Sequence, residues 1–240
     1  MSTAWVDAEM LAFDLETTGI DRFHDVPVSF ALVSMRAGEV LEEMHSLVNP
    51  GRPIPAGALA VHGISQERVE AEGMPLADAV TIIVEVLLDA SRRGVPVVGY
   101  NLQYDLTMTD ARVREERGMG LIDLGWRGPV VDALVLDRRA DKYRSGNRKL
   151  DTVCDLYGVV NAAAHDAAGD AVASAQVLRA ICAKYPKLVS YDLNELTAFE
   201  AEWHREWADG MDAFLKGKGK AGLDEGDFFW PIAGESMFNA

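Results

Sequence analysis

Apolar residues fall in short runs and in helical stripes along most of the chain. Five short apolar runs predict strands at residues 9–14, 28–36, 39–48, 95–100 and 128–132. Only Ala37 and Gly38 separate the second run from the third, and so short a connection predicts a β-hairpin. The segment 49–55 is rich in proline and glycine, which predicts a loop.

Helical spacing follows each of the later runs. Apolar residues recur every three or four positions from Leu76 to Leu88, which predicts an amphipathic helix. Further helices are predicted at residues 103–117, 132–140, 149–157 and 167–184. A hairpin followed by alternating strands and helices indicates an α/β fold, in which helices cover a mixed sheet. Pro186 is predicted to end the last of these helices, which divides the chain into a domain, 1–186, and a C-terminal helix and tail, 187–240.

The C-terminal segment carries an aromatic stripe at helical spacing. The stripe consists of Leu196, Phe199, Trp203, Trp207, Met211, Phe214 and Leu215. It can pack on the preceding domain, or it can contact a partner protein or a second copy of the chain through residues 192–215. The opposite face is expected to meet solvent because it carries Glu200, Glu202, Glu206 and Asp209.

Composition narrows the class of protein. The 240 residues are 49% hydrophobic, enough for a sizeable core, and two cysteines are too few for a disulfide framework. No run of 18 apolar residues and no basic leader occurs, so a cytoplasmic location without membrane contact is expected. The net charge of −15 argues against a broad electrostatic grip on nucleic acid. It leaves room for a nucleic-acid enzyme whose acids hold metal ions.

Two acidic residues, Asp14 and Glu16, end the first apolar run. Residues i and i+2 of a strand point to the same face, so the two carboxylates lie side by side and repel each other unless a cation intervenes. Carboxylate oxygens suit Mg²⁺ or Mn²⁺. Thr17, Thr18 and Gly19 follow and offer backbone amides to a phosphate or sugar. A polar strand end that meets solvent is the alternative interpretation.

Two further acids and one histidine stand at the ends of later elements. Asp105 opens a helix after the fourth predicted strand, where it can cap the helix or face a ligand. Asp170 precedes an apolar helical run, and His165 lies on the loop before it. A first-turn acid and a loop histidine are the simpler interpretation. Taken together with Asp14 and Glu16, however, these residues indicate a two-metal hydrolytic site in which His165 accepts a proton from water.

Four blocks of sequence resemble the DEDDh 3′–5′ exonucleases, a family that includes the epsilon proofreading subunit of bacterial DNA polymerase III and its stand-alone relatives. All four occur in the family order with family-like gaps, and the resemblance covers about residues 8–184. The blocks are Asp14-x-Glu16-Thr17-Thr18-Gly19, Val61-His62-Gly63-Ile64, Asn101-x-x-Tyr104-Asp105 and His165-x-Ala167-x-x-Asp170. A sister group places tyrosine where this chain has Asp166, so the histidine subtype is indicated.

The resemblance implies a fold and a set of roles. The fold is RNase H-like, a five-stranded mixed sheet with an antiparallel second strand and helices on both faces, here followed by a C-terminal helical extension. The implied ligands of two divalent ions, Mg²⁺ or Mn²⁺, are Asp14, Glu16, Asp105 and Asp170, and the implied general base is His165. The residues expected to contact the 3′-terminal nucleotide are Thr17, Thr18, His62 and Asn101. The chain departs from the family at Tyr104, usually phenylalanine, and at Gly57, where some relatives place an acid.

A basic block stands out in this acidic chain. Six basic residues fall within twelve positions, namely Arg138, Arg139, Lys142, Arg144, Arg148 and Lys149. The block is predicted to lie on a loop because Ser145, Gly146 and Asn147 interrupt it. Arg144, Arg148 and Lys149 are candidate phosphate contacts, and a solvated loop is the alternative.

The sequence thus predicts hydrolysis of the terminal phosphodiester of DNA, 3′ to 5′, in proofreading or repair, with single-stranded or frayed ends favoured. An exonuclease that trims RNA is an alternative, because no residue clearly reads a 2′-hydroxyl. A silent module that tethers a polymerase through the C-terminal helix is the non-enzymatic alternative, and the intact set of acids argues against it.

Overall fold

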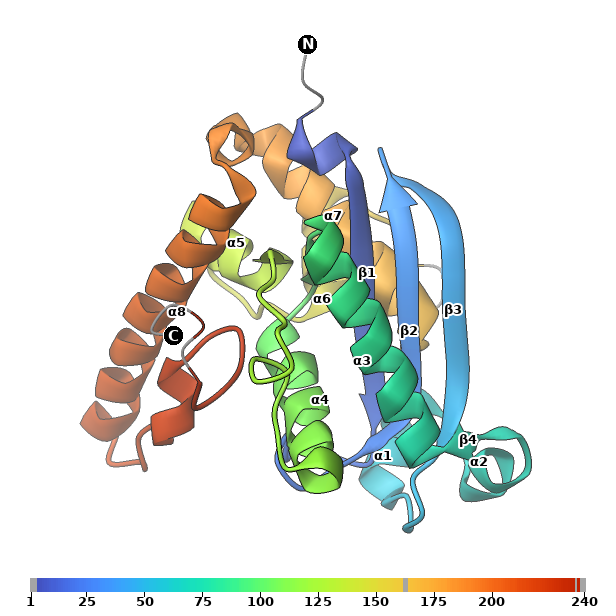
Figure 1. Cartoon of the computed structure of the whole chain (residues 1–240). Coiled ribbons are helices and arrows are strands. Elements are labelled where there is room, and N and C mark those ends of the chain that lie inside the picture. Colours follow the sequence, from blue (N-terminus) through green and yellow to red (C-terminus); the bar gives the residue numbers. More distant parts are fainter. Residues whose placement is uncertain (1–3, 162–163, 236, 238–240) are drawn as a thin grey trace.

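A six-stranded mixed sheet forms the centre of the molecule (Figure 1). The computed structural model describes residues 4–161, 164–235 and 237. The strands are β1 (Glu9–Thr17), β2 (Pro27–Arg36), β3 (Glu39–Asn49), β4 (Met74–Pro75), β5 (Val97–Gly99) and β6 (Val130–Asp132). Their order across the sheet is β4-β3-β2-β1-β5-β6. The predicted mixed sheet is confirmed, and β2 is antiparallel to β1 as expected. Five strands were predicted, and the sheet has six, because the two-residue strand β4 pairs with the end of β3.

Strand β1 lies in the interior of the sheet because its apolar residues serve both faces. Leu11 and Phe13 join the core cluster that contains the residues of α3 and α4. Met10 and Ala12 join the cluster on the other face, with α7. Asp14 and Glu16 continue the series of Met10 and Ala12, so they emerge on the α7 face at the carboxyl end of the strand.

Helices cover both faces of this sheet, and every predicted helix is present. One face carries α3 (Leu76–Arg93) and α4 (Leu102–Arg117). The other carries α5 (Ala133–Ala140), α6 (Leu150–Tyr157) and α7 (Ala167–Lys184). Helix α3 runs five residues beyond its predicted end and stops at Gly94, whose φ of +67° suits glycine. Among the described residues, no helix is both long and apolar enough to span a membrane.

Two short helices were not predicted. They are α1 (Ala56–His62) and α2 (Gln66–Glu72), and they follow the predicted loop directly. Helix α2 starts where the Ser65 hydroxyl accepts a hydrogen bond from the amide of Arg68. Each helix has only seven residues, and the described structure buries Val69 alone among them. So short a segment with so few apolar contacts shows no helical period in the sequence.

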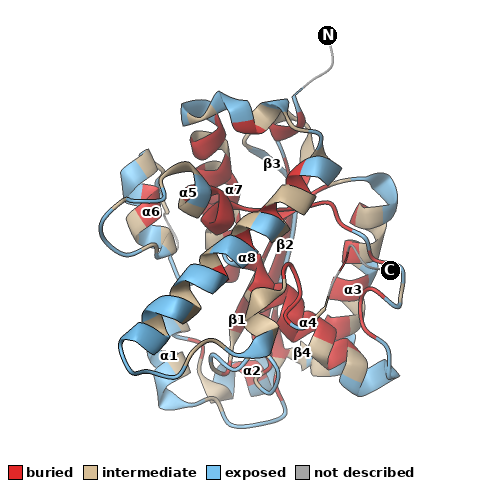
Figure 2. Cartoon of the chain, turned by 90° about the vertical axis from the view of Figure 1, so that its left-hand side faces the viewer, coloured by how far each residue is buried: buried red, intermediate tan, exposed pale blue. Residues whose placement is uncertain are grey.

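The C-terminal segment packs against the rest of the chain. Helix α8 (Leu193–Gly217) lies along the β6 side of the sheet, beside α5 (Figure 2). Short 3₁₀ helices precede and follow it, at Pro186–Ser190 and Glu225–Phe228, and a third lies near the N-terminus at Trp5–Asp7. Asp192 and Glu195 form a capping box that starts α8. Trp230 and Ile232, beyond α8, are buried in the same core cluster as α3 and α4. The boundary predicted at residue 186 stays a prediction, but core contacts cross it.

Helix α8 covers the edge strand β6 with polar side chains as well as apolar ones. The Thr197 hydroxyl accepts from the amide of Val130 at 3.1 Å and lies 3.0 Å from its carbonyl oxygen. The Glu200 carboxyl accepts from the amide of Asp132 at 2.8 Å. The expectation that Glu200 faces solvent is therefore wrong, since this residue is fully buried. Its role is to satisfy a backbone group of an edge strand that would otherwise lack a partner.

Candidate active site

Three of the predicted acids meet at the carboxyl end of β1. The β1 strand places Asp14 and Glu16 two residues apart on one face, and the first turn of α7 places Asp170 against them. One ligand oxygen from each of the three lies within 4.8 Å of the other two. Carboxylate oxygens at such separations form the donor set that a hard divalent cation prefers.

Asp170 is held in place by the loop that precedes its helix. Its carboxylate accepts a hydrogen bond from the side-chain amide of Asn161 at 2.6 Å and one from the backbone amide of His165 at 3.3 Å. Asp166 caps the same helix by accepting from the amide of Gly169. Neither Asn161 nor Asp166 was predicted as part of the site, although an acid directly before an apolar helical run is a helix-start signal.

Asp105 is the fourth acid and joins the cluster from α4. Its carboxylate accepts from the amide of Leu15, the residue between Asp14 and Glu16, at 3.1 Å. Asp132 fixes the start of α4, because its carboxylate accepts from the amides of Asn101 and Leu102, both at 2.9 Å. The structure therefore brings Asp14, Glu16 and Asp170 into one cluster and places Asp105 next to Asp14, through the amide of Leu15.

Burial and mutual repulsion raise the pKa values of these acids. Burial, and then the charges of Asp105 and Asp170, raise the pKa of Asp14 well above its usual range. Burial and the charge of Asp170 raise the pKa of Glu16 to about 7. Burial also raises the pKa values of Asp105 and Asp170. A bound cation would remove both the repulsion and the desolvation cost, so the donor set fits a divalent ion.

His165 lies on the exposed loop before α7. Its φ of +64° is in the left-handed region, which is uncommon for a residue other than glycine and costs on the order of 1 kcal/mol. The amide of His165 donates to the Asp170 carboxylate, which holds the histidine beside the acid cluster. The neighbouring residues 162 and 163 lie outside the described part of the chain.

His62 stands at the end of α1, next to β1. Its Nδ1 accepts from the amide of Ile64 at 3.0 Å, which leaves the proton on Nε2. Burial lowers the pKa of His62, with the Thr17 backbone acting in the opposite direction. Although the Thr17 backbone is close, Nε2 is buried and has no hydrogen-bond partner among the described residues. The imidazole of His62 thus lies against the Thr17 backbone, at the carboxyl end of β1.

The segment after β1 is tied down by hydroxyl groups. The Thr17 hydroxyl lies 2.8 Å from the Tyr104 hydroxyl, and both contact the carbonyl oxygen of Gly19. The Thr18 hydroxyl donates to Asp25 at 2.7 Å. Tyr104 stands where the family usually has phenylalanine. The structure shows that the added hydroxyl links α4 to the segment after β1.

The three candidate phosphate contacts of the basic block differ in their surroundings. Arg144 and Arg148 both bind the Asp137 carboxylate, which is fully buried, and both guanidinium groups are largely covered. These two arginines therefore neutralise an internal acid, which occupies part of their hydrogen-bond donors. A contact between them and a phosphate stays a prediction. Lys149 is exposed, and its phosphate contact stays a prediction too.

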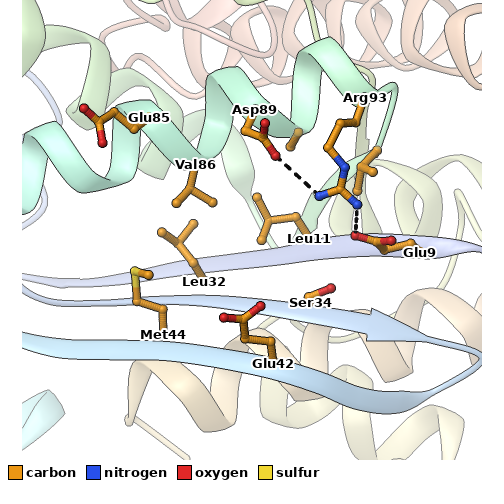
Figure 3. Close-up of a pocket in the computed structure, with 12 residues that line it drawn as sticks. Glu9, Leu11, Leu32, Ser34, Glu42, Met44, Glu85, Val86, Asp89 and Arg93 are labelled. Atoms are coloured by element: carbon orange, nitrogen blue, oxygen red, sulfur yellow. Dashed lines mark hydrogen bonds and ion pairs between the residues drawn. The ribbon is translucent and has the colours of Figure 1, made fainter.

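A separate groove of about 340 Å³ lies between α3 and the sheet (Figure 3). Its floor is apolar, with Leu11, Leu32 and Val86 pointing inward. Its rim is acidic, and its one arginine, Arg93, binds Glu9 and Asp89. This groove opens on the face opposite Asp14, and its acidic rim would repel a polyanion. It is not the place for a nucleic-acid substrate.

The sequence is similar to those of known exonucleases and DNA polymerases. The family model described as "Exonuclease" matches residues 11–178. The PolC-type DNA polymerase III of Lacticaseibacillus paracasei is 30% identical over 174 residues, which are 72% of this chain and 11% of that protein. The chain therefore spans only about a tenth of that relative's length.

Solved structures of Escherichia coli exonuclease I share the fold. Its complex with a dT13 oligonucleotide aligns with a TM-score of 0.62 at 21% identity over 77% of this chain and 43% of that one. The zinc-bound form of its single-stranded DNA complex aligns with a TM-score of 0.62 at 19% identity over 85% of this chain and 45% of that one. At such identities the likeness extends to the fold alone.

Proposed function

The chain belongs to the exonuclease family, and from this premise we propose that it removes nucleotides from the 3′ end of a DNA strand by hydrolysis. The predicted membership in the DEDDh 3′–5′ exonucleases is confirmed by the family match over residues 11–178. The proposed reaction breaks the terminal phosphodiester and releases a nucleoside 5′-monophosphate. DNA is the favoured substrate because exonuclease I, which shares the fold, has been solved with a DNA oligonucleotide.

The meeting of Asp14, Glu16 and Asp170 carries this proposal. Their oxygens lie within 4.8 Å of one another, and Asp105 is fixed beside them through Leu15. We assign these four acids as the ligands of two divalent ions, Mg²⁺ or Mn²⁺. When bound, such ions lower the pKa of a water and stabilise charge on the leaving oxygen.

His165 is the proposed general base. It lies on an exposed loop beside Asp170, where it can receive a proton from the attacking water and pass it to solvent. The imidazole ring accepts the proton in its neutral form. The carboxylates hold the metal, and His165 moves the proton.

The 3′-terminal nucleotide is proposed to lie over Thr17 and Thr18. His62 lies beside Thr17 and is proposed to contact the same nucleotide. Asn101 opens α4, whose first turn supplies Asp105, and its side chain is exposed toward the same end of the sheet. We propose that the site takes a single strand or a frayed end.

The alternatives differ in substrate and in chemistry. An RNA-trimming exonuclease would use the same acids and His165. A silent module that tethers a polymerase, or self-association, would use residues 192–215. The aromatic residues Phe199 and Trp203 of that segment pack on Tyr191, and Trp203 also contacts both core clusters. Much of the aromatic stripe is therefore already engaged within the chain.

The direct test is a degradation assay on 5′-labelled oligonucleotides. Single-stranded DNA, 3′-recessed DNA and matched RNA are incubated with and without Mn²⁺, beside the Asp14→Ala variant. We expect a metal-dependent ladder that shortens from the 3′ end, faster on single-stranded DNA than on RNA, and no ladder with the variant. No ladder on any substrate would overturn the proposal, and a faster RNA ladder would replace DNA with RNA as the substrate.

A further inference from the structure

A basic hollow lies between α5 and α8, on the side of the molecule that Figure 2 faces. It encloses about 150 Å³ and is lined by four cationic side chains, two tryptophans and one acid, Glu206, which binds Arg139 at 3.2 Å. Its lining residues are Arg138, Arg139, Lys142, Arg148, Trp203, Glu206 and Trp207. In a chain with a net charge of −15, such a local excess of positive charge marks a place for an anion.

Arg138 is the central cation of this hollow. Its guanidinium carbon lies 3.6 Å from the centre of the Trp207 ring, so the plane of the guanidinium is held by the indole. Burial lowers the pKa of Arg138 to about 10, which still leaves the group charged at neutral pH. Arg138 makes no ion pair and no side-chain hydrogen bond with any described residue. Its N–H donors are therefore free, unlike those of Arg144 and Arg148.

A second hollow connects Arg138 with the start of α4. It encloses about 180 Å³, shares Arg138 and Trp207 with the first hollow, and reaches Asn101 and Gln103. Asp105 lies about one turn of α4 beyond Asn101. The two hollows, which we call the basic channel, thus extend from the start of α4, the helix that carries Asp105, past Arg138 to Lys142.

We propose that the basic channel binds the sugar-phosphate backbone of a single-stranded nucleic acid on the 5′ side of the scissile bond. Arg138 and Lys142 would contact phosphates directly, Arg138 through the planar donor edge that suits phosphate oxygens. Arg139 would contact a phosphate through the donors that its ion pair with Glu206 leaves over. Tyr143 is 91% exposed, and its ring, with the Lys142 ammonium 6.0 Å from its centre, offers a face on which a base can stack. This inference rests on the proposed function and assigns the C-terminal helix to substrate binding, through Trp203 and Trp207.

The test compares substrates that end within the active site with substrates that reach the channel. KM is measured for dT4 and dT12 with the wild type and with the combined variant Arg138→Gln, Arg139→Gln, Lys142→Gln. We expect KM for dT12 to be at least tenfold below that for dT4 in the wild type and less than threefold below it in the variant. The slope of log KM for dT12 against the logarithm of the salt concentration should fall by about 2 in the variant, since three phosphate contacts are lost.

The matched control removes three positive charges elsewhere, by Arg36→Gln, Arg68→Gln and Arg92→Gln, which are all exposed. The control should keep the full difference between dT12 and dT4. If it loses the difference equally, or if the channel variant keeps it, the proposal is wrong. If the triple variant does not fold, Arg139→Gln with Lys142→Gln, both exposed, should still raise KM for dT12 at least threefold. An unchanged KM would again overturn the proposal.

A binding measurement separates this inference from the proposed function. Fluorescein-labelled dT12 is titrated with the Asp14→Asn chain, with and without the three channel substitutions, in EDTA, and anisotropy gives Kd without turnover. A rise in Kd of at least tenfold supports the channel even if the wild type yields no ladder. An unchanged Kd rejects the channel even if the ladder appears.

Discussion

His165 is the residue whose proposed role can be separated from metal binding. Only its backbone amide contacts the acid cluster, so removal of the imidazole leaves Asp14, Glu16 and Asp170 in place. We expect His165→Ala to lower kcat by about 10²–10⁴-fold, the usual contribution of a general base. Stabilisation by Mn²⁺ in a thermal melt should persist. His24→Ala, at an exposed histidine beside Asp21, is the control, and full activity of the His165 variant would refute the assignment.

Glu200 should make the folded chain less stable as the pH rises. Burial, and then the charge of Asp132, raise the pKa of Glu200 well above its ordinary value of 4.5. Above that ordinary value the unfolded chain releases the proton that the folded chain keeps, so the free energy of unfolding falls with pH. The groups that face Glu200 are Asp132 on β6 and Cys182 on α7.

Replacement of Glu200 by glutamine tests this dependence. Glu200→Gln retains an acceptor for the amide of Asp132 and removes the ionisable group. We expect the variant to be more stable than the wild type by about 1–3 kcal/mol at pH 8.5 and by clearly less at pH 5.5. Urea unfolding at the two pH values gives the comparison. An equal difference at both would contradict the account.

Residues with chemical motifs were predictable, and residues with buried polar partners were not. The four acids and His165 follow from their spacing and order in the sequence. Arg144 and Arg148 looked like surface cations because the sequence does not show that Asp137 is buried and binds both of them in the folded chain. Glu200 did carry a signal, since it lies four residues after Leu196, on the apolar stripe.

At the scale of elements, α8 acts as the cover of the sheet edge. Thr197 and Glu200 satisfy backbone groups of β6, and Trp230 and Ile232 extend the core beneath α3 and α4. A chain cut after residue 186 would expose an edge strand and lose buried apolar surface. We expect the fragment 1–186 to aggregate or to melt at least 10 °C lower, as measured by circular dichroism. A fragment that melts cooperatively at the full-length temperature would instead support the predicted boundary.

Long elements with a clear period were predicted, and short ones were not. Helix α7 has its predicted bounds, because 18 residues give several turns of apolar repetition. Helices α1 and α2 and strand β4 are too short to show a period, and they form because α2 and β4 pack against β3. The position of α8 at the β6 edge also follows from tertiary contacts that no local pattern contains.

Charge is distributed unevenly over the whole molecule. Acids dominate the cluster at the end of β1 and the rim of the α3 groove, while the basic channel lies between α5 and α8. A chain of net charge −15 can therefore attract a nucleic acid at one place and repel it elsewhere. The acid cluster needs cations for the same electrostatic reason, so metal binding and substrate binding should strengthen each other.

Titration with Mn²⁺, followed by calorimetry, tests the central claim that the four acids form a two-metal site. The experiment uses the full chain with thymidine 5′-monophosphate, the proposed product, and the Asp14→Asn variant beside it. We predict two Mn²⁺ ions per wild-type chain and the loss of at least one in the variant, because an oxygen of Asp14 lies within 4.8 Å of the oxygens of Glu16 and Asp170. A wild-type chain that binds no Mn²⁺, or a variant that binds it equally well, would contradict the account.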